Sequence, residues 1–427
     1  MSHDHQSTSA NESGLRPDQR PVAAGMPMLP PVQEPATGSH LPHMIGAGFP
    51  LVAGLYFYGW RGAAVLAGVL GSTAVAVSLW RKVGRRGGLL RQGPAMWSAV
   101  LLCMMLPPHL LAGESLSWHA GALWWLVPAA GLLMGGVLWL AGGNGLSRLQ
   151  PPVLVYLILW LCGGEAFAPH LVLHRSHALV GDLADAAPAA RVELSPWEQP
   201  WVRQRQLSRA QAVSIPETAA WQLGRYTRGQ PPSHGWISLE GMVRDLMPPL
   251  EDLVIGGHPG PLGASSGIAV IVGGLFLMYR RVIGYRIPLV MLAAACVSLA
   301  LLPVPVVVSE SGGQWRLLLA PGSTVDLATA VAFLSYQIMG SGLLLTAFFL
   351  ATRPSIHPAR HGAQIIFALL AGCATAAGQL YVDCAAGAYI ALLAVELIWA
   401  VLDRRLPGWD RMRAGIAEHS IKSGKSA

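Results

Sequence analysis

The chain has 427 residues, of which 53% are apolar and only 12% are charged, whereas soluble domains carry roughly 25% charged residues. This composition excludes an ordinary soluble domain and predicts a protein that crosses a membrane several times. The formal net charge of +7 does not indicate nucleic-acid binding, because the basic residues lie in short loops between apolar segments, where they set orientation in the bilayer.

The chain begins with a polar region, residues 1–42, which is rich in Ser, Pro, His and Gln. We expect a disordered cytoplasmic tail here and not a signal peptide, because no apolar core follows a basic start. Ten apolar segments follow, and each is about long enough to cross roughly 30 Å of hydrocarbon. They lie at 43–60, 63–80, 95–111, 120–140, 151–168, 265–282, 287–307, 325–350, 362–381 and 385–403. The predicted fold is therefore an all-α polytopic membrane protein with about ten transmembrane helices.

The basic residues predict how the chain is oriented. Short loops on one side carry only Arg61 and Arg316, whereas the loop at 81–94 and the tail at 404–427 on the other side are strongly basic. Because cytoplasmic loops are enriched in Lys and Arg, both termini are predicted to be cytoplasmic. This pattern is typical of a multi-pass protein of the bacterial cytoplasmic (inner) membrane, with the long loop at 169–264 outside.

The loop at 169–264 is predicted to be an extracytoplasmic loop or cap with short helices on the membrane surface, because structureless loops of this length are uncommon. At its start His170, His174 and His177 are spaced i, i+4 and i+7, which places them on one face of a helix. Three imidazoles on one face would bind Zn²⁺ or another divalent metal. The alternative is a polar exit from the fifth segment.

A Gly/Pro-rich stretch precedes the sixth apolar segment. Irregular backbone at the end of a membrane segment is tolerated only where it lines a cavity or is buried in protein. We therefore expect cavity-lining residues here and in a second Gly/Ser stretch, and the two groups would occupy equivalent places in the two halves. They are Gly263, Ser265, Ser266, Gly267, Gly340, Ser341 and Gly342. The alternative is a flexible linker.

Two stretches of the chain resemble each other, at 92–110 and 339–358. Each begins with Gly and Ser, continues through bulky apolar residues and ends in Pro. With five segments in 43–168 and five in 265–403, the two halves would be inverted five-helix repeats with a binding site near the membrane midplane. The alternative is that Gly, Ser and Leu are simply common in membrane helices.

Few ionisable residues interrupt the apolar segments, and Glu396 is the deepest of them. An intramembrane carboxylate costs at least ~2.5 kcal/mol to bury, so it marks a functional position. We expect Glu396 to relay a proton or to bind a cation. The alternative is a structural hydrogen bond to a Ser or Tyr across the helix bundle.

Five stretches carry a resemblance to the RnfD membrane subunits of the Rnf-type ion-translocating electron-transport complexes and, more distantly, to the NqrB membrane subunits of the Na⁺-translocating NADH:quinone reductase. They are QGPAMWSAVLLCMMLPP (92–108), GGNGLSRLQPPVLVYLIL (142–159), ASSGIAVIVGGLFLMYRRVIGYRIP (264–288), GSGLLLTAFFLATRP (340–354) and GAYIALLAVELIWAVLDRRLP (387–407). The third and fourth stretches are the most specific.

The chain departs from the family pattern at three places. Arg353 stands where the family has the Asp of an ATDP motif, and the family's Asn in the first half falls near Leu149 and Gln150. The family carries FMN on a Thr of an S-G-A-T motif in the outer loop, and this chain has no such motif. The nearest candidates for flavin attachment are Ser214 and Thr218, so covalent attachment is not expected from the sequence.

The resemblance implies a membrane subunit of an Rnf/Nqr-like complex that couples flavin-linked electron transfer to translocation of Na⁺ or H⁺. It also implies FMN or another flavin as cofactor and other subunits of a membrane electron-transport complex as partners. Two alternatives stay open. One is a urea-transporter-like solute channel or transporter, because two inverted five-helix halves are also that architecture. The other is a non-redox membrane anchor for peripheral redox subunits.

Overall fold

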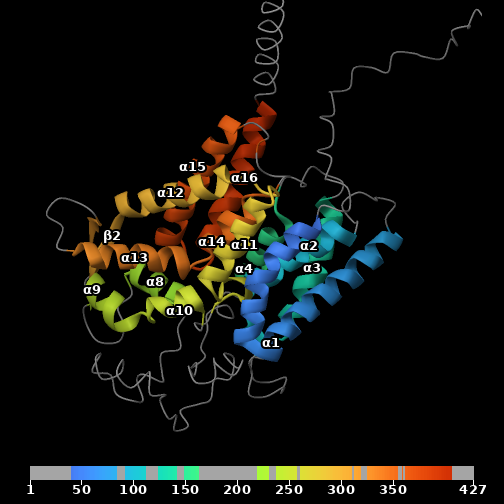
Figure 1. Ribbon diagram of the computed structural model, residues 1–427, viewed down its shortest axis with the longest axis horizontal. Helices are drawn as coiled ribbons and strands as arrows, with labels where there is room; N and C mark the ends of the chain where they lie inside the picture. Colours follow the sequence, from blue (N-terminus) through green and yellow to red (C-terminus); the bar gives the residue numbers. More distant parts are fainter. Residues whose placement is uncertain are drawn as a thin grey trace, which may run out of the picture. The chain divides into compact units, whose positions relative to one another are not determined.

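A computed structural model describes residues 40–83, 92–111, 124–141, 149–162, 219–229, 237–256, 260–309, 312–318, 325–353, 358 and 361–405. The first half of the apolar region contains α1 (His40–Val83), α2 (Gln92–Met105), the short 3₁₀ helix η1 (Pro108–Leu111), α3 (Leu126–Ala141) and α4 (Pro151–Cys162) (Figure 1).

The second half contains α11 (Gly267–Tyr279), α12 (Arg286–Leu301), α13 (Leu327–Met339), α14 (Leu343–Leu345), the π-helix η6 (Thr346–Leu350), α15 (His361–Tyr381) and α16 (Gly387–Arg405). Between the halves lie α8 (Ala219–Thr227), α9 (Leu239–Gly241), the π-helix η4 (Met242–Leu246), α10 (Leu250–Ile255) and the 3₁₀ helix η5 (Leu262–Ala264).

The long helix α1 is broken at Gly59, which has φ 56° and ψ −138°. This conformation lies in the left-handed half of φ space, which glycine adopts without the steric penalty of a Cβ atom. Figure 1 shows α1 as two arms that meet at a sharp bend. The bend falls at the boundary between the predicted segments 43–60 and 63–80.

By length and composition, two helices among the described residues are able to cross a membrane, Leu41–Lys82 and His361–Tyr381. A third span is obtained if Leu327–Met339 and Leu343–Leu350, which are bent by 57° relative to each other, are taken together. Shorter apolar helices are Gly93–Met105, Leu126–Leu140, Pro151–Cys162, Gly267–Tyr279, Arg286–Leu301 and Gly387–Leu402. A largely helical membrane protein is therefore confirmed, and the count of ten helices stays a prediction.

Three short strands form an antiparallel sheet that was not predicted from the sequence. The order is β1 (Ile237–Ser238), β2 (Pro303–Ser309) and β3 (Gly312–Leu317). The expected helical segment at 287–307 is wrong at its end, since α12 stops at Leu301 and β2 begins at Pro303. Prolines lack the N–H that a helix needs, and the β-branched valines that follow favour a strand. The sheet joins part of the loop between the halves to the end of α12, because Ile237 pairs with Val308.

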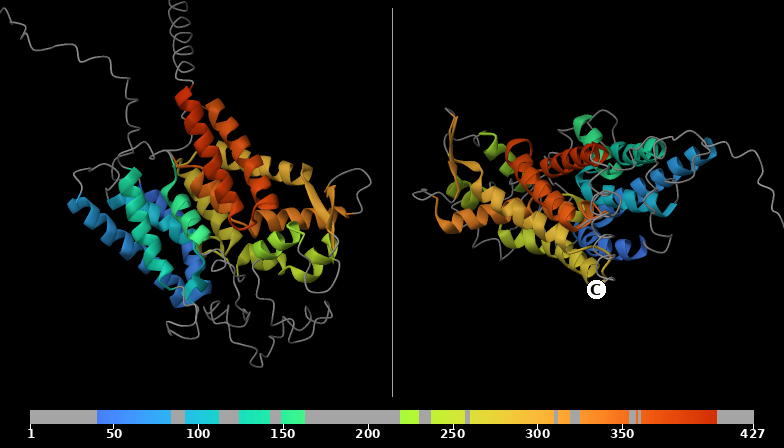
Figure 2. Two further views of the ribbon diagram at one scale, coloured as in Figure 1. Left: turned by 180° about the vertical axis from the view of Figure 1, so that it is seen from behind. Right: turned by 90° about the horizontal axis from the view of Figure 1, so that it is seen from above.

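Close helix packing uses glycine in both halves. A Cβ atom on Gly131 of α3 would lie 1.9 Å from Ser72 Oγ of α1, and one on Gly372 of α15 would lie 2.4 Å from the Met291 carbonyl oxygen of α12. The helices α15 and α16 run side by side (Figure 2). The first arm of α1 also packs against α11, where a Cβ on Gly273 would lie 2.5 Å from the Gly46 carbonyl oxygen. Small residues thus let backbones approach in both halves.

A second apolar cluster packs the segments between the halves against the membrane helices. Leu223 of α8, Met242 of η4 and Leu253 of α10 are buried together with Phe333 of α13 and Leu380 of α15. The described part of the long loop therefore forms a cap that is fixed to the second half.

Candidate functional site

Glu396 lies in the middle of α16 and is almost completely buried, with 2% of its surface exposed. The backbone N–H of Gln150 donates a hydrogen bond to Oε2 of Glu396 over 3.3 Å. The second carboxylate oxygen, Oε1, is buried and has no hydrogen-bond partner among the described residues. The predicted ionisable residue is thus buried, and only one of its two carboxylate oxygens accepts a hydrogen bond among the described residues.

Gln150 brings the first half of the chain to this carboxylate. It directly precedes Pro151 at the start of α4, and its side-chain amide donates to the carbonyl oxygen of Leu350 over 2.6 Å. Leu350 ends the π-helix η6, where carbonyl groups lack partners within the helix. The amide oxygen of Gln150 is buried and without a hydrogen-bond partner in the part of the chain described.

Arg353 follows η6 and is buried, with 8% of its surface exposed. Its Nη2 donates to Ser98 Oγ of α2 over 3.3 Å, and that hydroxyl donates to the carbonyl oxygen of Pro94 over 2.9 Å. The positive charge of Arg353 acts on Glu396. A buried carboxylate needs such compensation, because an uncompensated buried charge is strongly destabilising.

These four side chains, Glu396, Gln150, Arg353 and Ser98, are called the Glu396 cluster below. They come from α16, the start of α4, the end of η6 and α2, so the cluster lies where the two halves of the chain meet. In the sequence, Arg353 falls in the loop between the predicted segments 325–350 and 362–381, whereas the structure buries its side chain, and its charge acts on Glu396.

A second group of buried polar residues, called the Gln379 cluster below, lies near the start of α16. Gln379 Nε2 donates to Ser341 Oγ over 2.7 Å, and Ser341 Oγ donates to the carbonyl oxygen of Gln337. The thiol of Cys384 donates to Gln337 Oε1 over 3.5 Å. All four residues are buried, and both Gln337 Nε2 and Gln379 Oε1 lack hydrogen-bond partners within the described ranges.

Two tyrosines lie between the clusters. Tyr389 is completely buried, and its hydroxyl has no hydrogen-bond partner among the residues that the structure places. Its ring meets that of Tyr156 of α4 edge to face, with the centroids 4.9 Å apart. Tyr389 precedes Glu396 by seven residues, so both side chains project from the same face of α16.

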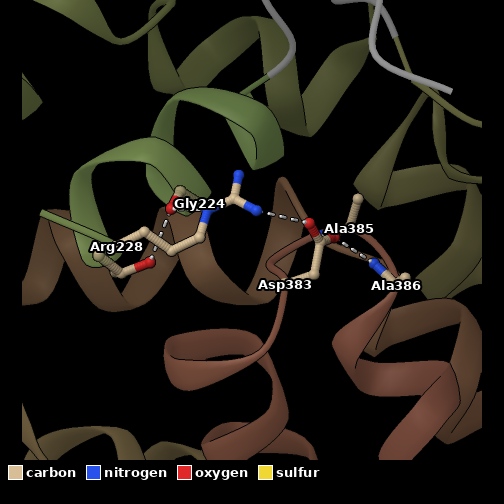
Figure 3. Close-up of polar contacts among 6 residues, drawn as sticks. Gly224, Arg228, Asp383, Ala385 and Ala386 are labelled. Atoms are coloured by element: carbon tan, nitrogen blue, oxygen red, sulfur yellow. Dashed lines mark hydrogen bonds and ion pairs between the residues drawn. The ribbon is translucent and has the colours of Figure 1, made fainter. Parts of the chain in front are cut away.

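An ion pair connects α8 to the start of α16 (Figure 3). Oδ1 of Asp383 accepts hydrogen bonds from the backbone N–H groups of Ala385 and Ala386, both over 2.8 Å, and thereby stabilises the turn that leads into α16. Oδ2 lies 3.5 Å from Nη1 of Arg228, whose Nε donates to the Gly224 carbonyl oxygen over 3.0 Å. The ion pair therefore ties α8, which belongs to the described part of the long loop, to the turn beside Cys384.

The serine and glycine residues predicted to line a cavity are buried against protein. Cβ atoms on Gly263 and Gly342 would lie 2.4 Å from Met104 Cβ and from the Tyr389 hydroxyl, respectively. The corresponding distances at Gly267 and Gly340 are 3.2 Å to the Leu253 carbonyl oxygen and 2.8 Å to the Tyr336 carbonyl oxygen.

Ser265 Oγ donates to the Leu262 carbonyl oxygen and Ser266 Oγ to that of Val254, over 3.3 and 3.2 Å. Neighbouring protein atoms thus occupy the space beside these glycines, and the serine hydroxyls bond to backbone carbonyls. This arrangement does not fit the cradle that an isoalloxazine ring requires. Among the predicted residues, Ser341 belongs to the Gln379 cluster and Gly342 contacts Tyr389. The other group, Gly263, Ser265, Ser266 and Gly267, lies beside α1, α2 and α10.

The remaining predicted residues, Ser214, Thr218, His170, His174 and His177, lie outside the described residues. Flavin attachment and a histidine metal site therefore stay predictions. Within the described ranges, no group of three or more His, Cys, Asp or Glu side chains is placed to hold a metal ion.

Sequence reasoning missed Gln150, Gln337, Gln379 and Tyr389 as members of buried polar groups. One feature of the sequence could have identified them as buried polar residues. Each is a polar side chain flanked mainly by apolar residues or prolines. That signal does not say which of them meet, because Gln150 and Glu396 are 246 positions apart.

Comparisons with known proteins agree with the resemblance. Residues 38–407 match the family described as NQR2, RnfD, RnfE. The chain is 28% identical over 328 residues to the D subunit of the ion-translocating oxidoreductase complex of Halorhodospira halophila, and the match covers 75% of each chain. It is also 28% identical over 152 residues to the D subunit of the proton-translocating ferredoxin:NAD(+) oxidoreductase complex of Clostridium ljungdahlii, covering 36% of this chain and 40% of the relative.

A further relative is the D subunit of the Na(+)-translocating ferredoxin:NAD(+) oxidoreductase complex of Acetobacterium woodii. It is 28% identical over 161 residues, which cover 37% of this chain and 42% of the relative. Relatives whose names specify different ions thus align with this chain at the same level of identity.

Proposed function

The chain belongs to the NQR2, RnfD, RnfE family, and we propose from this premise that it is a membrane subunit of an Rnf-like complex. In this complex it couples electron transfer, linked to flavin, to movement of Na⁺ or H⁺ across the bacterial cytoplasmic membrane. Its partners are the other subunits of that complex. The relatives are named as subunits of ion-translocating oxidoreductases, which supports both statements.

The observation that carries the coupling role is the burial of Glu396 where the two halves meet. Gln150, which bonds to Glu396, shares the Leu350 carbonyl oxygen with the backbone N–H of Arg353. A purely structural anchor gains little from a carboxylate inside the bilayer, because burying it is costly. An ion-translocating subunit needs a site that gains and loses charge between the two faces. Glu396, with one carboxylate oxygen held by Gln150 and the other free of hydrogen bonds among the described residues, meets this need.

We also propose that the chain forms ten membrane helices in two inverted repeats. Supporting this proposal, α1 packs on α3 as α12 packs on α15, in each case through a buried glycine contact, Gly131 and Gly372. In addition, the first helices of the two halves pack against each other at Gly46 and Gly273, as expected near a pseudo-two-fold axis. The positive-inside pattern places both termini in the cytoplasm.

Flavin is the cofactor that the family resemblance implies. When bound it would supply one- and two-electron transfer. The described residues form no cradle for it, and Ser214 and Thr218 are the attachment candidates that the resemblance leaves. The role proposed for the Glu396 cluster does not depend on where a flavin is carried.

The proposal is tested by purifying the chain with an affinity tag from its native membrane. We expect the other subunits of an electron-transport complex to copurify and the preparation to reduce NAD⁺ with reduced ferredoxin. The control is an unrelated multi-pass protein with the same tag. Isolation of the chain alone, together with solute flux in proteoliposomes, would support a channel instead and contradict the proposal.

A further inference from the structure

We propose that the ion exchanged at Glu396 is a proton, and that the guanidinium of Arg353 is a fixed positive charge that excludes Na⁺ from this site. The inference rests on the proposed function and specifies its cargo.

The first argument is the lack of ligands for a metal cation. Hard cations are held by shells of about six oxygen atoms. Around Glu396, the Leu350 carbonyl oxygen accepts hydrogen bonds from the Gln150 amide over 2.6 Å and from the Arg353 N–H over 3.3 Å, which occupy both of its lone pairs. The Ser98 hydroxyl donates to Pro94 and accepts from Arg353. Within the described cluster this leaves Oε1 of Glu396 and the amide oxygen of Gln150 as oxygens without a hydrogen bond. These two oxygens make a poor Na⁺ site, whereas one is enough for a proton.

The second argument is charge. A guanidinium keeps its positive charge in proteins, so Arg353 presents a cation to Glu396 in every state of the site. Its exposed fraction of 8% means that water screens this charge weakly. A Na⁺ ion would therefore enter beside a like charge. A proton that binds to Oε1 instead forms a neutral carboxyl group, so no second cation is placed near Arg353.

The third argument is the row of polar groups along α16. The hydroxyl of Tyr389 is fully buried and lacks a hydrogen-bond partner among the described residues, and so does Gln379 Oε1 in the cluster beyond it. Tyr389 and Glu396 are seven residues apart, about 10.5 Å along the helix axis, so bridging groups of the size of water are required between them. In each transfer Oε1 gains a proton from one side and releases the same proton to the other, and no other bond changes.

The test uses membrane vesicles that contain the whole complex, energised by its own electron donor. Quenching of a pH-sensitive dye reports proton uptake, and radioactive Na⁺ reports sodium uptake. The wild type is expected to take up protons at a rate that does not depend on Na⁺. The Glu396→Gln variant is expected to lose proton uptake. Asp326→Asn, at the exposed N-terminus of α13, removes a carboxylate in the same way and is expected to leave uptake unchanged.

Arg353 is tested by two substitutions. Arg353→Lys keeps the positive charge and is expected to retain proton uptake without sensitivity to Na⁺. Arg353→Gln removes the charge and adds an amide oxygen, so Na⁺ is expected to compete with protons and inhibit uptake. The amount of assembled complex, measured by size-exclusion chromatography, separates this effect from a folding defect, and the Lys variant still tests the charge if the Gln variant does not assemble.

The outcomes separate the inference from the proposed function. Sodium uptake that persists when a protonophore is added would overturn the assignment of a proton but leave ion coupling intact. Electron transfer without uptake of either ion would contradict the proposed coupling function itself. Full proton uptake by Glu396→Gln would remove Glu396 from the path, and a Lys variant that becomes sensitive to Na⁺ would overturn the role of Arg353.

Discussion

Replacing Gly372 with alanine tests the contact between α15 and α12 on which the second half depends. The added Cβ atom would lie 2.4 Å from the carbonyl oxygen of Met291 and 2.7 Å from Cβ of Ala294, and a real Cβ does not approach other atoms so closely. Overpacking of this kind costs about 1–3 kcal/mol. Alanine also favours a helix over glycine by roughly 0.5–1 kcal/mol, which partly offsets the loss.

Gly362 is the matched control because it lies in the same helix and a Cβ atom added there would meet no neighbouring atom within 4 Å. Gly362 lies in the first turn of α15, where alanine gains no more helix propensity than it does at Gly372. The difference between the two variants is therefore a lower bound on the cost of the contact, which is about 1–3 kcal/mol. The assay is thermal unfolding of the purified chain in detergent, with Gly372→Ala expected to unfold at a lower temperature than Gly362→Ala. Equal stabilities would refute the close approach of α15 and α12.

Further predictions concern other parts of the fold. Gly59→Ala should destabilise the chain by about 1–3 kcal/mol in thermal unfolding, because φ 56° is unfavourable for a residue with a side chain; an unchanged midpoint would contradict the break in α1. Asp383→Ala removes the acceptor of the turn before α16 and the ion pair to Arg228, and should speed trypsin cleavage after Arg228. Asp383→Asn keeps an acceptor oxygen for the turn and should have a smaller effect. Acid-denatured protein should carry no covalent flavin, and in-gel flavin fluorescence that disappears in Ser214→Ala or Thr218→Ala would show that expectation to be wrong.

The apolar segments and the break near Gly59 were predictable, because hydrophobic runs and glycine report on local structure. The end of the seventh segment was not recognised, although Pro303 and Pro305 interrupt it, because an apolar run alone does not distinguish a buried strand from the end of a helix. The strand at 303–309 is stabilised by partners that include Ile237, which lies far away in the sequence.

Glu396 could be identified from the sequence as a buried carboxylate, but its partners could not. The sequence identifies Gln150 and Arg353 only as departures from the family pattern, in two different loops. Their meeting at Glu396 depends on how α4 and η6 pack, which no local pattern encodes. The departures are therefore linked in space, and the Arg that replaces a family Asp supplies charge to a buried carboxylate.

The most direct test of the account compares ion uptake driven by electron transfer in vesicles that contain wild-type complex, Glu396→Gln complex and Asp326→Asn complex. We predict that ion uptake is lost only in the Glu396 variant, while all three complexes assemble with their partner subunits. Uptake at the wild-type rate in the Glu396 variant would contradict the claim that this buried carboxylate couples electron transfer to ion movement.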